Sequence, residues 1–356
     1  MAQKIIGTHE AFDAFVGLMT SQPEGVFFSH LSEEGDSQWH HGVGEAEKVD
    51  FDHDDFPFFC VTDFLGEKNI AWKFRKVSVG NGQTSSPKKS KKFHLKARSL
   101  ETEKSFTEKI KQIQDFQKEG NAWVINLAHE FQGHLDAQTD PFDIAVAIFR
   151  QFLKQNQPHT GGFIWTKDLK AISLSPETFL THEGKILKTF PIKGTGEKQD
   201  LQKNTKEQAE LNMITDLLRN DLGQICQSVE VLEERVLSDQ KNFYHAHSVI
   251  QGTLPESKLT WAQYKKLLPA GSISGAPKKR VVEKIGALEN FQRDFYTGTF
   301  GVRLSREESF FGILIRTLFF KDKHWKLPVG AGITVESDPK SEWQETLIKA
   351  KSCLDF

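Results

Sequence analysis

The sequence predicts a mixed α+β fold, and three observations support this class. Segments with helical apolar spacing and segments with strand-like apolar runs are both present, and both are long. They do not follow the steady strand–helix alternation of a doubly wound parallel sheet. The chain has 356 residues, of which 38% are hydrophobic, so it can bury one large core or two ordinary ones.

The first predicted elements lie between residues 105 and 129. Residues 105–120 (SFTEKIKQIQDFQKEG) begin with Ser105 and Glu108, which have capping-box spacing, and they end at Gly120. This pattern predicts a helix. The next segment, 122–129 (AWVINLAH), is predicted to be a strand.

Two more helices are predicted in the middle of the chain. Residues 141–156 (PFDIAVAIFRQFLKQN) start with Pro141 and show helical apolar spacing, and 161–166 (GGFIWT) follow as a strand. Residues 204–223 (NTKEQAELNMITDLLRNDLG) form the second helix, which ends at Gly223.

Three elements are predicted near the end of the chain. Residues 310–320 (FFGILIRTLFF) have the continuous apolar pattern of a buried strand. Residues 327–335 (LPVGAGITV) form another strand, and 338–354 (DPKSEWQETLIKAKSCL) form a closing helix. Arg316 interrupts the first of these strands, and a buried charge must be paired. Its partner is a carboxylate of either a ligand or the protein itself.

Composition excludes several classes of protein. The net charge of −2 gives no reason to expect nucleic acid as a partner. The chain has no apolar run of roughly 18 residues, which a membrane helix needs, and its start lacks the features of a signal peptide. The three cysteines have neither metal-site nor disulfide-framework spacing. We therefore expect a cytoplasmic protein that binds no membrane.

The first hundred residues contain two charged clusters. Residues 50–56 (DFDHDDF) are acidic, whereas residues 85–98 (SSPKKSKKFHLKAR) are basic and contain no acid. The neutral overall charge favours a solvated loop over an anion-binding patch for the basic run.

Two of the predicted helices carry paired glutamates near their starts. Glu207 and Glu210 form one pair, and Glu342 and Glu345 form the other. Residues at i and i+3 share a helix face, so each pair presents two carboxylates together. The helix dipole alone would tolerate them there. Facing each other across a cleft, the two pairs would suit magnesium.

A glycine–serine segment and a histidine pair are further candidates. Residues 268–288 (LPAGSISGAPKKRVVEKIGAL) run from a loop into a helix with Pro277 near its first turn, which gives either a plain helix start or an anion site. His245 and His247 share one face of a probable strand. No nearby spacing supplies the further ligands of a zinc site, so these are core or active-site histidines.

Lys193 lies inside a short apolar run that a glycine closes, in residues 190–199 (FPIKGTGEKQ). Taken alone, it is a lysine whose stem packs while its ammonium reaches water. Its neighbours in sequence offer a second interpretation, because several motifs in the chain belong together.

Taken in order, these segments resemble the chorismate-utilising enzymes, a family that includes anthranilate, aminodeoxychorismate, isochorismate and salicylate synthases. The resemblance covers roughly residues 105 to 354. It implies a large mixed β-sheet sandwich flanked by helices, with 1–100 as a divergent N-terminal part and 101–356 as the catalytic region. The matching segments are LSPETFL, PIKGT, KEQAELNMITDLLRNDLG, HSVIQGTLPE, PAGSISGAPKKRVVEKIGALE, FYTGTFG, ILIRTL and GAGITVESDPKSEWQETLIKAK.

The resemblance also implies roles for the site residues. The glutamates ending each pair, Glu210 and Glu345, would hold Mg²⁺ with Glu207 and Glu342 beside them, and the ion would take the ring carboxylate of chorismate. The side chains of Arg316 and Tyr296 and the loop amides around Gly275 and Ala276 would take the enolpyruvyl carboxylate. The remaining implied substrate-binding residues are Gly332 and Lys349.

Within this family, PIKGT with a lysine is similar to aminodeoxychorismate synthase component I. The implied chemistry is covalent: Lys193 attacks the ring, Glu177 acts on the departing hydroxyl, and ammonia then displaces the lysine. His245 falls on the family's active-site histidine. Val124 stands where isochorismate and salicylate synthases carry a water-activating lysine, which argues against those activities.

The implied product is 4-amino-4-deoxychorismate, on the route to 4-aminobenzoate and folate. Because the sequence shows no glutaminase nucleophile motif, ammonia would come from a separate glutamine amidotransferase subunit. Two alternatives stay open: anthranilate synthase component I, and a chorismate-binding protein without catalytic activity.

Overall fold

The computed structural model describes residues 8–22, 24–31, 37–82, 95–155, 160–196, 205–239 and 244–354. The described strands form one 18-stranded sheet, and the pairings among them are antiparallel. Together with the flanking helices, this sheet confirms the α+β class. The strands are β1 (Gly25–Leu31), β2 (Ser37–Val49), β3 (Phe58–Thr62), β4 (Asn69–Gly82), β5 (Arg98–Ser99), β6 (Val124–His134), β7 (Thr160–Trp165), β8 (Lys170–Ser175), β9 (Thr178–Glu183), β10 (Ile186–Thr189), β11 (Ile192–Gly196), β12 (Ser228–Asp239), β13 (Tyr244–Thr253), β14 (Gly275–Ala276), β15 (Thr299–Ser305), β16 (Glu308–Ile313), β17 (Thr317–Lys321) and β18 (His324–Ile333).

The sheet is a long ribbon whose two halves pack against each other. One half runs β12–β13–β10–β9–β16–β15–β3, and the other runs β1–β7–β8–β17–β18–β6, with β4 and β2 joining them. The ring of His30 in β1 stacks on that of Phe310 in β16 with centroids 4.0 Å apart. Phe28 and Phe300 make an edge contact across the same interface at 5.3 Å. The core between the halves therefore joins segments that are far apart in the sequence.

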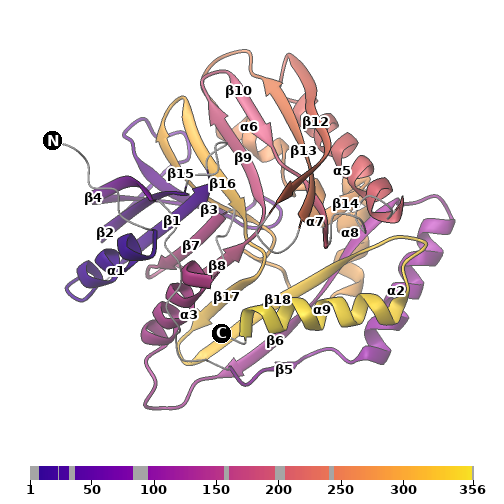
Figure 1. Ribbon diagram of the computed structural model, residues 1–356, viewed down its shortest axis with the longest axis horizontal. Coiled ribbons are helices and arrows are strands. Elements are labelled where there is room, and N and C mark those ends of the chain that lie inside the picture. Colours follow the sequence, from indigo (N-terminus) through magenta and orange to yellow (C-terminus); the bar gives the residue numbers. More distant parts are fainter. Residues whose placement is uncertain are drawn as a thin grey trace.

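Helices cover the outer faces of this ribbon (Figure 1). The described helices are α1 (Thr8–Met19), α2 (Glu103–Lys118), α3 (Pro141–Gln155), α5 (Thr205–Gly223), α6 (Trp261–Lys266), α7 (Gly271–Ser274), α8 (Lys278–Leu288) and α9 (Pro339–Leu354). Helices α1 and α3 cover the β1–β7–β8 region through an aromatic cluster that includes Phe12, Phe27 and Phe149. Helices α9 and α2 lie along β18 and β6, and α5 lies beside β12 and β13.

Most predicted elements from residue 105 onward are confirmed to within a few residues, but α2 does not begin with the predicted capping box. Its N-cap is Thr102, whose Oγ1 accepts a hydrogen bond from the amide of Ser105 at 3.2 Å. The helix therefore starts before the predicted capping box. β6 also extends to His134, beyond its predicted end, because β18 pairs with it along ten residues.

The prediction of one continuous strand over residues 310–320 was wrong. β16 ends at Ile313 and β17 begins at Thr317, so the two strands belong to different halves of the sheet. Arg316 lies in the break with φ of 49°, in the left-handed region that L-residues seldom adopt. The chain turns from one half of the sheet to the other at this position.

Strands on both sides of residue 100 pair with one another, as β1 does with β7 and β3 with β15. The first hundred residues and the rest of the chain therefore contribute strands to one sheet. Most of the basic run over 85–98 lies outside the described residues. Among the described helices, none is long and apolar enough to cross a membrane.

Candidate active site

Helix α5 carries the first glutamate pair. Its apolar residues Leu211, Ile214, Leu218 and Leu222 are buried against the sheet, which is the spacing of one helix face. Thr215 Oγ1 donates a hydrogen bond to Ser248 Oγ in β13 at 3.1 Å and fixes the helix on the sheet. The side chain of Glu210 is half-buried, whereas that of Glu207 lies outside the described residues.

Lys193 lies in an irregular part of β11. Ile192 pairs with His247 and Thr195 with His245, and the register shifts between these two pairs. Lys193 therefore sits in a β-bulge, a feature that re-aims side chains and is common beside active sites. The side chains of Lys193 and His245 lie outside the described residues, but the backbone of Lys193 lies in β11 and that of His245 in β13, the strand predicted for it.

The glycine–serine segment is more ordered than the predicted loop. It forms the short helix α7 and then β14, in which Gly275 and Ala276 pair with Ile125 and Val124 of β6. The amide of Gly275 donates to the carbonyl of Gly271. Pro277 is the N-cap of α8. Residues 271–276 together form the α7–β14 loop.

Two residues that the sequence analysis missed hold this loop in place. Arg293 makes a bidentate ion pair with Glu289, with Nη2–Oε1 and Nε–Oε2 distances of 2.7 and 2.9 Å. Its guanidinium also donates to the carbonyls of Ile273 and Asn126 at 3.1 and 2.7 Å. Glu289 Oε1 accepts the amide of Ala128 at 2.8 Å. The Arg293–Glu289 pair thus holds the α7–β14 loop against β6. In the sequence, only the i,i+4 spacing of the two residues indicates that they could pair.

Tyr296 follows this pair and is 4% exposed. Its amide donates to the carbonyl of Arg293 at 2.8 Å. Burial is the main cause that raises the pKa of the Tyr296 hydroxyl, so this group stays protonated.

Glu177 and Arg316 are brought together by their backbones. The carbonyl of Glu177 accepts the amide of Ile313 at 3.2 Å, and that of Arg316 accepts the amide of Leu174 at 3.1 Å. Both side chains are half-buried. Among the described residues, no carboxylate makes an ion pair with the guanidinium of Arg316.

Helix α9 carries the second glutamate pair. Glu342 is 6% exposed. Glu345 Oε1 lies 2.6 Å from Lys349 Nζ, which also donates to the carbonyl of Gly330 in β18 at 2.9 Å. Gly332 pairs with Asn126, next to Ile125, which pairs with Gly275. β6 therefore places α9 and the α7–β14 loop on its two sides.

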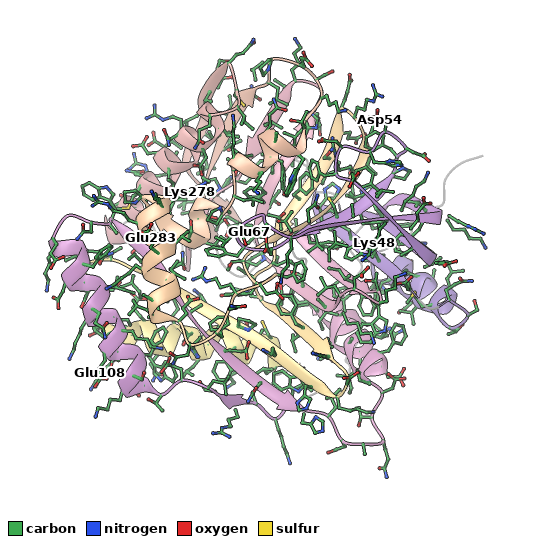
Figure 2. The ribbon with its side chains drawn as sticks, turned by 180° about the vertical axis from the view of Figure 1, so that it is seen from behind. Lys48, Asp54, Glu67, Glu108, Lys278 and Glu283 are labelled. Atoms are coloured by element: carbon green, nitrogen blue, oxygen red, sulfur yellow. The ribbon has the colours of Figure 1, made fainter. Side chains whose placement is uncertain are left out.

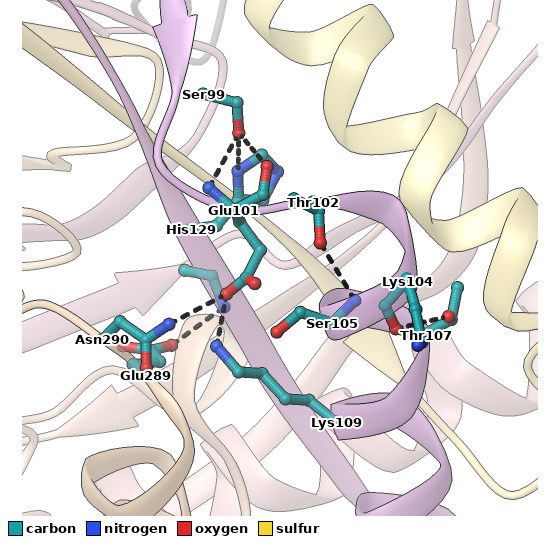
Figure 3. Close-up of polar contacts among 11 residues, drawn as sticks. Ser99, Glu101, Thr102, Lys104, Ser105, Thr107, Lys109, His129, Glu289 and Asn290 are labelled. Carbon is teal, nitrogen blue, oxygen red and sulfur yellow. Dashed lines mark hydrogen bonds and ion pairs between the residues drawn. The ribbon is translucent and has the colours of Figure 1, made fainter.

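A buried polar cluster lies where β6 meets the start of α2 (Figure 3). His129 Nε2 shares a hydrogen bond of 2.8 Å with Thr346 Oγ1, next to Glu345 in α9. Burial lowers the pKa of His129 to about 4, so the ring is neutral at pH 7. Glu101 and Lys109 form a buried ion pair in the same cluster.

The described residues do not form a complete metal site. No three His, Cys, Asp or Glu side chains in the described part of the chain converge on one point. Magnesium, however, commonly takes only one or two carboxylates and completes its shell with water and substrate oxygens. The oxygen donors of Glu210, Glu342 and Glu345 suit that ion, and Glu345 already holds a cation, the Lys349 ammonium.

Comparison with known proteins identifies one enzyme family. A profile of the chorismate-binding enzymes matches residues 6–355. Anthranilate synthase component 1 3 of Haloarcula marismortui is 32% identical over 265 residues, which are 71% of this chain and 52% of that protein. Aminodeoxychorismate synthase component 1 of Bacillus subtilis is 30% identical over 262 residues, 70% of this chain and 54% of that protein.

The matched stretch thus spans about half the length of these curated relatives. Among solved structures, the menaquinone-specific isochorismate synthase of Escherichia coli superposes with a TM-score of 0.80 at 19% identity. The superposition covers 98% of this chain and 92% of that one. At this identity, the likeness shows a shared fold.

Proposed function

Because this chain belongs to the family of chorismate-binding enzymes, we propose that it acts as component I of an aminodeoxychorismate synthase. It would convert chorismate and ammonia to 4-amino-4-deoxychorismate, a precursor of 4-aminobenzoate and folate. A separate glutamine amidotransferase would supply the ammonia. The observation that carries the proposal is the position of Lys193, in a β-bulge of the strand beside β13.

Lys193 would be the nucleophile. Its amine attacks ring carbon 2 of chorismate, both ring double bonds shift toward carbon 4, and the 4-hydroxyl leaves as water with a proton from Glu177. Ammonia then adds at carbon 4, both double bonds shift back, and the bond from carbon 2 to the lysine nitrogen breaks. The enolpyruvyl group is retained, and Lys193 is regenerated. Two such steps replace one difficult displacement.

The other site residues would bind and orient the substrate. Arg316 and the Tyr296 hydroxyl would take the enolpyruvyl carboxylate, with the α7–β14 loop beside them. A magnesium ion held by Glu210 and Glu345 would supply positive charge for the ring carboxylate. Lys349 would keep Glu345 in place through the carbonyl of Gly330. His245 would complete the site from β13.

Two rival activities differ in product. Val124 is 3% exposed and packs in the apolar core around α5 and α6, so this position offers no base to activate water for isochorismate formation. Anthranilate synthase component I is the closer rival, because the Haloarcula relative carries that name at 32% identity. Anthranilate formation would release pyruvate, whereas 4-amino-4-deoxychorismate keeps it as the enolpyruvyl group.

A product assay with matched variants tests the proposal. Incubation with chorismate, Mg²⁺ and ammonium should yield 4-amino-4-deoxychorismate by mass spectrometry. Lys193→Ala should slow its formation about a hundredfold or more, within the range for a lost covalent catalyst. Lys185→Ala removes an exposed lysine eight residues earlier and should leave the rate unchanged. Anthranilate as the main product, or a normal rate in Lys193→Ala, would contradict the proposal.

A further inference from the structure

A buried ion pair joins α5 to the start of α8. Lys278 Nζ lies 2.7 Å from Asp221 Oδ2, and the two side chains are only 18% and 4% exposed. The same ammonium donates to the carbonyl of Leu267 at 2.9 Å. Figure 2 shows Lys278 at the start of α8, with Glu283 further along that helix.

Helix preferences do not explain this pair. A lysine in the first turn of a helix lies at the positive end of the helix dipole, where a cation is disfavoured. Burial raises the pKa of Asp221 to about 6 and lowers that of Lys278, and each charge opposes the shift of the other. Burying both charges costs several kcal/mol per ion. The arrangement is stable only because the two groups meet.

The pair connects two elements that carry residues of the candidate active site. Asp221 follows Glu210 by three helical turns on the same face of α5, about 16 Å along the axis. Lys278 follows Ala276 by two residues. α5 also approaches the loop closely elsewhere, since a Cβ on Gly271 would lie 2.5 Å from Leu217 Cδ2. The end of α5 and the α7–β14 loop are therefore fixed to each other.

We propose that Asp221 and Lys278 are positioning residues that set the α7–β14 loop relative to the carboxylates of α5 for binding of the dianionic substrate. This inference rests on the proposed function. Neither residue touches the reacting atoms, since the Lys278 ammonium is occupied by Asp221 and by the Leu267 carbonyl. Their effect is on where the loop lies and hence on substrate affinity.

Asp221→Asn keeps the shape of the side chain and removes its charge. We expect the KM for chorismate to rise about ten- to a hundredfold, as for a displaced binding group, with kcat within about threefold of wild type. Hydrogen–deuterium exchange in residues 268–277 should become about tenfold faster. Lys278→Arg keeps the charge, so its KM and its exchange rate in this segment should stay near those of the wild type. Lys279→Met removes an exposed charge from the same turn and is the matched control.

Loss of folding is separated from loss of positioning by a second variant. The double variant Asp221→Asn/Lys278→Met contains no unpaired buried charge, so its melting temperature should recover while KM stays raised. Normal KM and normal exchange in folded Asp221→Asn or in the double variant would overturn the inference. Faster loop exchange in an enzyme whose product is anthranilate would support the inference and contradict the proposed function instead.

Discussion

Gly275 lies where a side chain has no room. Its φ of 116° is unfavourable for L-residues, and an added Cβ would lie 2.1 Å from the carbonyl oxygen of Val124 in β6. In Gly275→Ala, β14 must separate from β6, so we expect a loss of stability of about 2–4 kcal/mol from strain and the broken pairing. Chemical denaturation of the variant measures this loss.

Gly286 offers the opposite case in the neighbouring helix α8. An added Cβ there meets no atom within 4 Å, and the residue lies within the helix, in its last turn. Gly286→Ala should therefore stabilise the protein by about 0.5–1 kcal/mol. If the two substitutions changed the free energy of unfolding equally, the contact between β14 and β6 would contribute nothing measurable to stability.

For individual residues, the sequence indicated which side chains are candidates for the site, but not which groups they contact. The glutamate pairs and Arg316 stood out because carboxylates at i,i+3 and a charge in an apolar run are visible locally. Arg293 and Lys278 did not stand out. Their roles come from carbonyls and carboxylates of other elements, and only the folded chain brings these groups together.

Elements with a strong local pattern were predicted well. α3 begins at Pro141 as expected, because proline suits the first turn of a helix. The break at Arg316 was missed because apolar runs on both sides of it are buried equally well in two different strands. β1–β4 were missed as well, since they carry no clear alternation and depend on pairing with distant strands such as β7 and β15.

α5 and α9 together make a prediction about magnesium. If Glu210 and Glu345 hold the ion, excess EDTA should abolish turnover, and Glu345→Gln should weaken Mg²⁺ activation about a hundredfold or more. Chorismate should raise the melting temperature only when Mg²⁺ is present, which measures binding without turnover. Glu283→Gln, on the exposed face of α8, is the control and should behave as wild type. Full turnover in excess EDTA would exclude the metal assignment.

The interface between the two halves of the sheet contains the buried histidines His30 and His40. His40 is 1% exposed, and its Nε2 lies 3.3 Å from that of His30. Burial, and secondarily the charges of His30 and His41, lowers the pKa of His40 to about 3. Burial also lowers the pKa of His41 to about 4. The rings of His30 and His40 stack on Phe310 in this interface, whereas the ring of His41 packs against Phe15 on the opposite face of β2.

These depressed pKa values predict acid destabilisation with a definite sign. An unfolded histidine titrates near pH 6.5, so between about pH 6.5 and pH 3 the unfolded chain binds protons that the folded chain does not. The free energy of unfolding therefore falls as pH falls through this window, and His40 alone contributes a loss of about 2 kcal/mol between pH 7 and pH 5. Urea denaturation at these two pH values measures the total. His40→Gln should reduce the difference between them, even if it lowers stability at pH 7, whereas exposed His134→Gln should leave it unchanged. An unaltered pH dependence in His40→Gln would show that the pKa of His40 in the folded protein is close to its unfolded value, and it would contradict the depressed pKa.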